Sequence, residues 1–328
     1  MSDLSFDTAF AAAPRGPARA LDPSRRYDAL VLGAGPAGIA AAIYLVRKGV
    51  VTGVIAQSLG GQVAWTAGIE NYPGYRLIDG AALVERFREQ VEEFSPDLAL
   101  GLEISAVSLA GGLFRVRAGG GEYAARTVIV ATGKRPRLLG VPGEQRLLGR
   151  GVAFCATCDA PLYRGRVVGV VGGGNSGIAA ALDLARVAER VLLFQDQGRL
   201  TADPVLERRV RAEPRVEILL GTAVTEVLGD ESVRGVRVRA AAGAPRDIPL
   251  EGLFVEIGLH PNSEPVRGLA PMNGRGEIEV DCACRTSVPG LFAAGDVTGV
   301  PYKQIVIAAG EGAKAALSAC DYLAHLEP

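Results

Sequence analysis

The feature that most constrains the fold is an internal repeat. The segment VLGAGPAGIAAAIYLVR at 31–47 returns as VVGGGNSGIAAALDLAR at 170–186, with ten of seventeen positions identical. In each copy, a short apolar run leads into the pattern G-x-G-x-x-G, and an alanine-rich run follows it. A strand, a glycine-rich turn and a helix in this order are typical of dinucleotide-binding domains. The repeat therefore predicts two such domains in an α/β chain.

The three glycines of each copy have different physical tasks. The first makes a tight turn, the second lets backbone approach a pyrophosphate, and the third lets the helix pack closely on the strand. The N-terminus of that helix then attracts phosphate. We assign these tasks to Gly33, Gly35 and Gly38 with Pro36 and Ala37, and to Gly172, Gly174 and Gly177 with Asn175 and Ser176. The alternative, two glycine-rich turns that bind no nucleotide, is disfavoured because both copies share the whole context.

The two domains are not expected to be consecutive. Two apolar stretches that end in Gly and then Pro, at 126–137 and 250–262, are typical of crossings between domains. The stretch 288–323 predicts a strand, a Gly-Asp turn and a helix that return to the first domain. We therefore expect residues 132–252 to form a second domain inserted in a first domain made of 26–131 and 253–328. Residues 1–25 lack periodicity, and we expect a flexible extension there.

Composition excludes several classes of protein. The chain has 35 Lys and Arg residues against 36 Asp and Glu, which leaves no basic surface for nucleic acid. No apolar run reaches the roughly 18 residues of a membrane helix, and the first 25 residues lack a signal-peptide core. Five cysteines in 328 residues do not suggest a secreted disulfide scaffold. We expect a cytoplasmic protein.

Two cysteines three residues apart, Cys155 and Cys158 in FCATCDAPLY, are the candidate reactive groups. They could form a redox pair, half of a metal site, or two buried thiols. Zinc would need two more ligands, and the remaining close pair, Cys282 and Cys284, has no histidine near it. The C-x-x-C spacing favours easy thiol–disulfide exchange and a lowered thiol pKa. We expect no metal, and we expect Cys282 and Cys284 to share one face of a strand.

From about residue 27 to 323 the chain resembles the low-molecular-weight thioredoxin reductases. It is also similar to the flavoprotein component of alkyl hydroperoxide reductase without its thioredoxin-like part. The matching motifs are GAGPAG, GGQV, IENYPG, VIVATG, CATCD, GGGNSG, LFAAGDV and PYKQ, in the family's order. The resemblance implies an FAD-dependent disulfide reductase with two Rossmann-like, three-layer domains, a homodimer, and a separate thioredoxin-like partner.

The resemblance also implies which residues bind FAD. Asp296 matches the residue that binds the ribityl chain, although an aspartate here could also cap a helix. Trp65 could line the flavin or could be a half-buried core aromatic. The residues matching FAD-binding positions are Gly33, Gly35, Pro36, Ala37, Gly38, Gly61, Gln62, Asn71, Thr132, Gly133, Gly295, Asp296, Lys303 and Gln304.

For the dithiol, the resemblance assigns a role to each residue. Cys158 faces the flavin and takes its electrons, and Cys155 attacks the partner's disulfide as a thiolate. Asp159 matches the proton donor and acceptor, since a carboxylic acid beside the pair can protonate a leaving thiolate. The alternative for Asp159 is a turn cap before APLY. Because the dithiol belongs to the second domain, the family's cycle requires domain rotation.

The second nucleotide site departs from the family. NADPH-dependent relatives carry a His-Arg-Arg cluster for the 2′-phosphate, whereas 191–210 reads VLLFQDQGRLTADPVLERRV, with Arg199 as the one cation before Arg208. NADPH is therefore disfavoured. At the strand end, where an NADH site would carry an acid, stands Gln195, followed by Asp196. We expect either NADH or a donor that is not a pyridine nucleotide, such as a ferredoxin.

Several functions remain open from the sequence. The leading one is a disulfide reductase of thioredoxin reductase type. The alternatives are an NADH-dependent alkyl hydroperoxide reductase flavoprotein, a ferredoxin-dependent reductase, a flavin dithiol oxidase, and a non-catalytic flavin-binding redox sensor. The joint presence of Cys155, Cys158 and Asp159 argues against the last.

Overall fold

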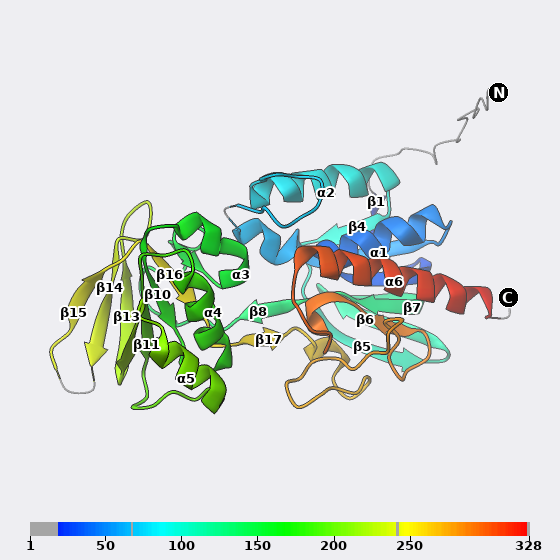
Figure 1. Cartoon of the computed structure of the whole chain (residues 1–328). Helices are drawn as coiled ribbons and strands as arrows, with labels where there is room; N and C mark the ends of the chain where they lie inside the picture. Colours follow the sequence, from blue (N-terminus) through cyan, green and yellow to red (C-terminus); the bar gives the residue numbers. More distant parts are fainter. Residues whose placement is uncertain (1–18, 67, 241–242, 327–328) are drawn as a thin grey trace, which may run out of the picture. The chain divides into compact units, whose positions relative to one another are not determined.

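In the first of two compact units, apolar runs form a mixed sheet, parallel except for the antiparallel strands β5 and β6, with helices packed on it (Figure 1). The computed structural model describes residues 19–66, 68–240 and 243–326. The sheet has the order β1-β4-β3-β2-β7-β6-β5, and β18 also pairs with β7. Its strands are β1 (Arg19–Ala20), β2 (Arg26–Ala34), β3 (Thr52–Leu59), β4 (Asp97–Leu100), β5 (Ile104–Ala110), β6 (Leu113–Ala118), β7 (Gly121–Val130) and β18 (Leu291–Ala293).

The central strand β2 is buried on both faces. Ala29 and Val31 pack into one core cluster with residues of the helices, whereas Leu30 and Leu32 pack into another with β6 and β7. A strand buried on both faces reads as a continuous apolar run, as YDALVL does. The helices of this unit are α1 (Pro36–Arg47), the longer part of α2 (Gly80–Phe94) and α6 (Ile305–Ala324), with short 3₁₀ turns η3 (Glu264–Val266) and η4 (Gly295–Val297).

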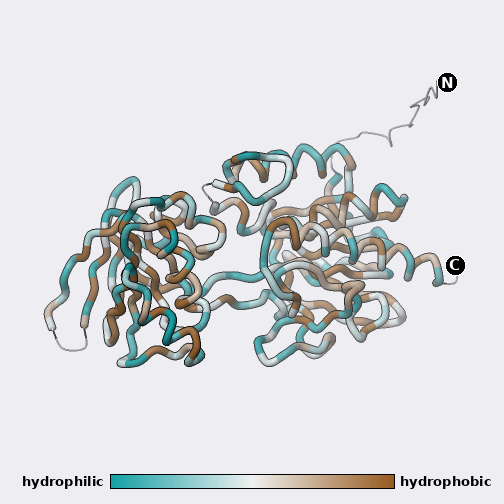
Figure 2. The backbone as a smooth tube through the Cα atoms, viewed as in Figure 1, coloured by the Kyte–Doolittle hydropathy of each residue, from teal (hydrophilic) through white to brown (hydrophobic). Residues whose placement is uncertain are grey.

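The second unit repeats this plan around a smaller parallel sheet of order β12-β11-β10-β16-β9. Alternate residues of β11 again enter two core clusters, one with α4 and one with an antiparallel sheet of order β13-β14-β15. Figure 2 shows the brown, apolar strands inside each unit. The strands are β9 (Val152–Ala153), β10 (Val167–Val171), β11 (Arg190–Gln195), β12 (Val216–Leu220), β13 (Thr222–Leu228), β14 (Gly235–Ala240), β15 (Arg246–Pro249) and β16 (Gly252–Val255).

The helices of the second unit are α3 (Ala156–Asp159), α4 (Asn175–Ala185) and α5 (Pro204–Ala212), with a 3₁₀ turn η2 (Ala160–Tyr163). A two-stranded ribbon lies where the chain enters and leaves this unit. It pairs β8 (Lys134–Pro136) with β17 (Leu259–Pro261) in antiparallel register, and Arg137 Nε donates to His260 Nε2 at 2.9 Å beside it. The predicted α/β class, with one Rossmann-like domain inserted in another, is confirmed.

The boundaries of the units differ from those expected from the sequence. The first unit comprises 1–61, 85–133 and 263–328, and the second comprises 62–84 and 134–262. The segment 62–84, which contains most of η1 (Gly61–Trp65), is therefore grouped with the dithiol-bearing unit. The reason is its packing: Gln62 Nε2 donates to Lys134 O at 3.0 Å, and Gly68 lies against Leu162.

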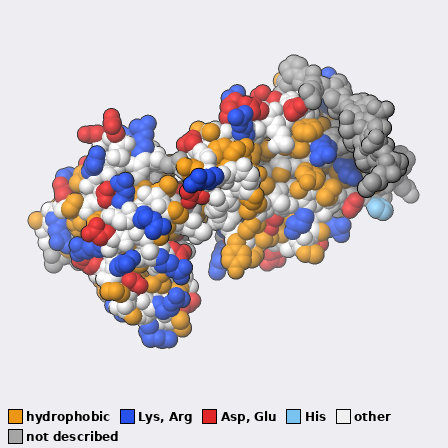
Figure 3. All heavy atoms as spheres, turned by 45° about the horizontal axis from the view of Figure 1, so that its top comes forward, with side chains coloured by type: hydrophobic (Ala, Val, Ile, Leu, Met, Phe, Trp, Pro, Cys, Tyr) orange, Lys and Arg blue, Asp and Glu red, His pale blue; other side chains and the backbone are white. Residues whose placement is uncertain are grey.

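The folded chain also begins before residue 26. Residues 1–18 of the expected extension lie outside the described residues, but Arg19 and Ala20 form β1, which pairs in parallel with β4. In the described part of the chain, no helix is long and apolar enough to cross a bilayer. The face drawn in Figure 3 carries basic and acidic side chains interspersed, which agrees with the net charge of −1.

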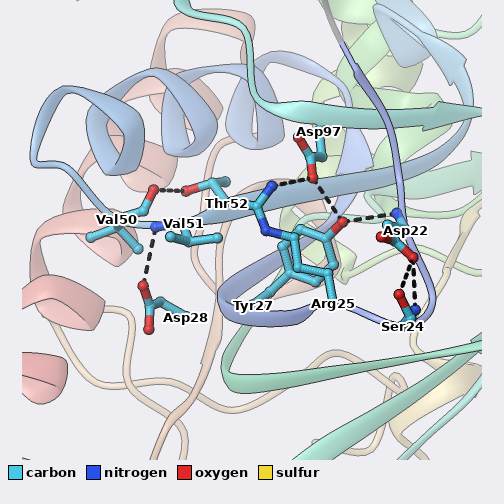
Figure 4. Close-up of polar contacts among 9 residues, drawn as sticks. All are labelled: Asp22, Ser24, Arg25, Tyr27, Asp28, Val50, Val51, Thr52 and Asp97. Atoms are coloured by element: carbon cyan, nitrogen blue, oxygen red, sulfur yellow. Dashed lines mark hydrogen bonds and ion pairs between the residues drawn. The ribbon is translucent and has the colours of Figure 1, made fainter. Parts of the chain in front are cut away.

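A polar network ties this early segment to β4 (Figure 4). The Tyr27 hydroxyl donates to Asp97 Oδ2 at 2.9 Å and accepts from the Asp22 backbone N–H at 2.9 Å. Arg25 Nη1 lies 2.8 Å from the same Asp97 oxygen. The Tyr27 side chain is fully buried, and burial is the main cause that raises its pKa to about 12. The hydroxyl therefore stays protonated and keeps both hydrogen bonds.

We predict that Tyr27→Phe lowers the free energy of unfolding by about 1–3 kcal/mol, because the Asp22 amide loses its acceptor and the Asp97 carboxylate loses the Tyr27 donor while keeping Arg25. Chemical denaturation of the whole chain measures this. The matched control is Tyr44→Phe, whose ring is 39% exposed on α1 and which should change little. Equal effects of the two substitutions would contradict the role of the network.

Candidate active site

The first glycine turn, between β2 and α1, has the geometry of a pyrophosphate cradle. Gly33 has φ +109°, and a Cβ added there would lie 2.3 Å from Ala131 O. A Cβ on Gly38 would lie 1.9 Å from Gly33 O, so the helix packs against the turn itself. By contrast, a Cβ on Gly35 would meet nothing within 4 Å. That open space, at the N-terminus of α1, is where a phosphate group can approach backbone N–H groups.

Other predicted FAD-binding residues lie around this turn in the first unit. Gly61 lies close to Gly35, because a Cβ added to Gly61 would lie 3.5 Å from Gly35 Cα. Thr132 and Gly133 follow Ala131, just after the end of β7. A Cβ on Gly295 would lie 3.0 Å from Ala37 Cβ, so the β18–η4 turn meets the start of α1. These contacts gather several of the predicted residues around the first glycine turn.

A small pocket in the same unit is lined by three of the predicted FAD-binding residues. Gly295, Asp296 and Lys303 line it, together with Glu311 of α6. Lys303 Nζ donates to the carbonyl oxygens of Thr298, at 2.7 Å, and Val300. Gln304 is the N-cap residue of α6. The pocket thus brings Asp296, in the turn that follows β18, together with Lys303 and Glu311.

Glu311 was not anticipated from the sequence. Its side chain is buried, and Oε2 accepts the Gly295 backbone N–H at 2.8 Å. Burial is the main cause that raises its pKa, while the Gly295 hydrogen bond and Lys314 oppose that rise. Glu311 therefore holds the Gly-Asp turn that presents Asp296. An acid in the helix that follows such a turn is the signal that could have revealed it.

Two predicted FAD-binding residues, Gln62 and Asn71, belong to the second unit. The Gln62 side chain is engaged with Lys134 O, and Asn71 also has an interaction. Trp65, at the end of η1, is 44% exposed and so is not a core aromatic.

The second glycine turn, between β10 and α4, repeats the geometry of the first. Gly172 has φ +128°, and a Cβ there would lie 2.4 Å from Glu256 O. A Cβ on Gly177 would lie 1.8 Å from Gly172 O, whereas Gly174 has only Thr201 Oγ1 within reach, at 3.7 Å. Open space at the middle glycine is again left for a phosphate.

The loop after β11 folds back onto this turn. Gln195 is 6% exposed, its Oε1 accepts the Gly173 N–H at 3.0 Å, and its Nε2 donates to Arg199 O at 3.3 Å. Asn175 exchanges two hydrogen bonds with Asp203, through its Oδ1 and its Nδ2. Both Gln195 amide atoms are thus engaged within the protein, and the neighbouring Asp196 is exposed. Ser176 lies in the first turn of α4 and is exposed.

Cys155 and Cys158 form a disulfide at the start of α3. Cys155 is the N-cap residue, and its Sγ accepts the Cys158 backbone N–H at 3.2 Å. Both residues are half-buried. An N–H donor aimed at this sulfur stabilises negative charge on it, so the geometry suits Cys155 to carry a thiolate after reduction.

Asp159 closes the same short helix. Its Oδ1 is buried and, among the described residues, has no hydrogen-bond partner. Burial raises the pKa of this carboxyl to about 6. The pKa of Tyr163 is raised to about 12, mainly by burial of its ring and secondly by the charge of Asp159. A carboxyl whose pKa is raised to about 6, whose Oδ1 has no hydrogen-bond partner and which makes no side-chain cap to η2 is suited to proton transfer.

The other cysteines correct one expectation. Residues 281–284 form a turn instead of the expected strand. In this turn, Asp281 Oδ1 accepts the backbone N–H groups of Ala283 and Arg285. Cys282 is consequently exposed while Cys284 is buried, so the two do not share a face. Cys320 is half-buried on α6. In the described ranges, no group of three or more His, Cys, Asp and Glu side chains is arranged to hold a metal ion.

Known proteins resemble this chain over most of its length. Residues 27–312 match the family model described as pyridine nucleotide-disulphide oxidoreductase. The F component of the alkyl hydroperoxide reductase of Pseudomonas putida is 48% identical over 93% of this chain and 60% of its own length. An NADH dehydrogenase from Bacillus subtilis is 44% identical over 90% of this chain and 58% of its own length. The chain thus spans about 60% of the length of the curated relatives it matches.

Solved structures agree with this assignment. A thioredoxin reductase from Streptococcus pyogenes is 36% identical and superimposes with a TM-score of 0.88, covering 92% of this chain and 99% of that one. A thioredoxin reductase from Giardia duodenalis is 31% identical with a TM-score of 0.85, over 92% and 99% of the two chains. The chain therefore belongs to the pyridine nucleotide-disulphide oxidoreductase family.

Proposed function

We propose that the chain is an FAD-dependent disulfide reductase of thioredoxin reductase type, which passes electrons through Cys155 and Cys158 to a separate thioredoxin-like protein. The observation that carries the proposal is the redox turn: a disulfide at the start of α3, followed by a buried acid whose Oδ1 has no partner in the described part of the chain. The open space at Gly35 supports a dinucleotide such as FAD at the first glycine turn, and in this proposal Asp296 binds the ribityl hydroxyls. Bound FAD supplies two-electron transfer between a pyridine nucleotide and a disulfide.

The residues of the redox turn then have distinct tasks. Two electrons enter at Cys158, the S–S bond breaks, and Cys155 is left as a thiolate held by the Cys158 N–H. That thiolate attacks the partner's disulfide, forming a mixed disulfide and releasing one partner thiolate. Asp159, when protonated, donates to that leaving thiolate. Cys158 then attacks Cys155 Sγ, which re-forms the S–S bond and releases the second partner sulfur.

NADH is the donor that the second glycine turn supports best. The exposed charged side chains after β11 are Asp196 and Arg199, and the Asp196 carboxylate can accept from a ribose hydroxyl while repelling a 2′-phosphate. The relative named NADH dehydrogenase is consistent with this choice.

A second candidate is the flavoprotein component of an NADH-dependent alkyl hydroperoxide reductase. The identity of 48% to the Pseudomonas putida alkyl hydroperoxide reductase component favours it. Its electron acceptor would be the disulfide form of a hydroperoxide-reducing protein rather than a thioredoxin. The same redox turn would serve both, so the two candidates differ in partner and not in chemistry.

We predict that NADH bleaches the flavin absorbance in an anaerobic titration at concentrations at least about tenfold below those needed with NADPH, since juxtaposed like charges cost several kcal/mol. Asp196→Ala should reduce this preference, whereas Asp230→Ala, at another exposed acid of the second unit, should not. Bleaching by dithionite alone would reject a pyridine nucleotide donor and favour a ferredoxin-type one. Rapid hydrogen peroxide formation from small thiols would instead indicate a dithiol oxidase.

We predict that Asp159→Asn slows reduction of a thioredoxin-type disulfide by about 100-fold or more. The pKa of Asp159 is about 6, so the protonated donor is present below that pH and is lost above it. The wild-type pH–rate profile should therefore contain a limb near pH 6 that falls with rising pH, and the variant should lack that limb. Asp183→Asn, at a half-buried acid of α4, is the control. An unchanged profile in Asp159→Asn would rule out proton donation by this residue.

A further inference from the structure

A left-handed backbone at a residue other than glycine is rare in this chain. Among the described residues, only Ser95, Cys284 and Tyr302 combine a side chain with a positive φ, of 51°, 63° and 60°. This conformation is costly for a residue with a Cβ, and it persists where contacts or a function require it. Ser95 ends α2, with its Oγ donating to Glu92 O at 2.9 Å, and Cys284 is buried in the core of the first unit. Contacts within the chain therefore account for two of the three.

Tyr302 differs from the other two because its side chain is 79% exposed. In the part of the chain that the structure describes, it is the most exposed of the large apolar side chains. It follows Pro301, and proline before a residue with positive φ is the pattern of a type II turn, where glycine usually takes the second of these places. Burial of the ring against the rest of the chain thus does not offset the cost of its backbone.

The loop that carries Tyr302 is held from both sides by other residues. Before it, the Thr298 Oγ1 and the Thr298 N–H both donate to Gly295 O, at 2.8 and 3.0 Å. After it, Lys303 Nζ donates to the carbonyl oxygens of Thr298, at 2.7 Å, and Val300. These contacts fix the loop without using the tyrosine ring. The backbone at residue 302 is therefore imposed by the loop, and the loop determines where the ring lies.

The ring lies at the pocket of the first unit. Tyr302 lines this pocket together with Asp296, Lys303 and Glu311. An aromatic ring and a carboxylate in one pocket suit a ligand that carries both a planar ring and hydroxyl groups, since the ring can stack and the carboxylate can accept hydrogen bonds. The flavin and ribityl parts of FAD have these two features.

We propose that Tyr302 is a residue of the FAD-binding site, whose ring packs against the flavin, and that the chain keeps a strained backbone at this position for that contact. The inference rests on the proposed function, specifically on FAD binding in the first unit. It assigns the ring to the cofactor rather than to a partner protein because Asp296, which we assign to the ribityl chain, lines the same pocket.

The test separates the fold from cofactor binding by measuring both on the full chain. The FAD dissociation constant is measured by titrating apoprotein with FAD and following flavin fluorescence, and the urea midpoint is measured on the apoprotein. Tyr302→Gly removes the ring and tolerates the left-handed backbone. We expect its FAD dissociation constant to rise about fivefold to tenfold, as for a lost aromatic contact. Its urea midpoint should stay at or above that of the wild type, because relief of strain offsets the entropic cost of glycine.

Two further variants control for the hydroxyl and for the strain. Tyr302→Phe keeps the ring and should bind FAD within about twofold of the wild type, because the aromatic contact is retained. Ser95→Gly relieves the same kind of backbone outside the pocket and should leave the FAD dissociation constant unchanged.

An unchanged FAD dissociation constant in Tyr302→Gly would overturn the proposal, and so would an equal loss of affinity in Tyr302→Phe. A urea midpoint of Tyr302→Gly below that of the wild type would show that the ring serves the fold, which also overturns it. Unchanged FAD binding with a raised KM for the disulfide partner would assign the ring to that partner instead. If the wild type binds FAD and Tyr302→Gly binds it equally well, the inference fails while the proposed function stands; if the wild type binds no FAD, both fail.

Discussion

The structure depends on the close approach of backbone to backbone at two glycine turns. At Gly38 and Gly177 a single methyl group would lie within 2 Å of a carbonyl oxygen of the same turn, so each helix can reach its strand only because no side chain intervenes. This contact directs the N-terminus of α1 and of α4 to the carboxyl edge of its sheet. At Gly312 a Cβ would likewise lie 1.9 Å from Ala37 O. The absence of a side chain at Gly312 therefore lets α6 pack closely on α1. The open space at Gly35 and Gly174 is what remains for phosphate.

The redox turn has a different physical character, because its chemistry depends on burial more than on charge pairing. Burial raises the pKa of Asp159 to about 6, and this carboxyl does not owe its pKa to a neighbouring cation. In the proposed reaction, the Cys158 N–H stabilises the thiolate on Cys155, and Asp159 supplies a proton.

Much of this could be predicted from the sequence, because the signals are local. The repeat of a strand, a glycine turn and a helix predicts both Rossmann-like units, and the C-x-x-C spacing predicts the pair that forms the disulfide. Features that depend on contacts distant in the chain were not predicted. Glu311 reaches Gly295 across different elements, and the turn at Cys282 replaces an expected strand because Asp281 accepts two backbone N–H groups. Segment 62–84 joins the second unit through packing that periodicity does not reveal.

The most direct test of the account is a count of electrons taken up by the purified, flavin-loaded protein in an anaerobic dithionite titration. Flavin and disulfide each accept two electrons, so the account predicts about four per chain for the wild type and about two for Cys158→Ser. Free thiols counted at the end of the titration should rise by about two in the wild type only. Uptake of about two electrons by both proteins would show that the Cys155–Cys158 disulfide does not exchange electrons with the flavin, and would contradict the central claim.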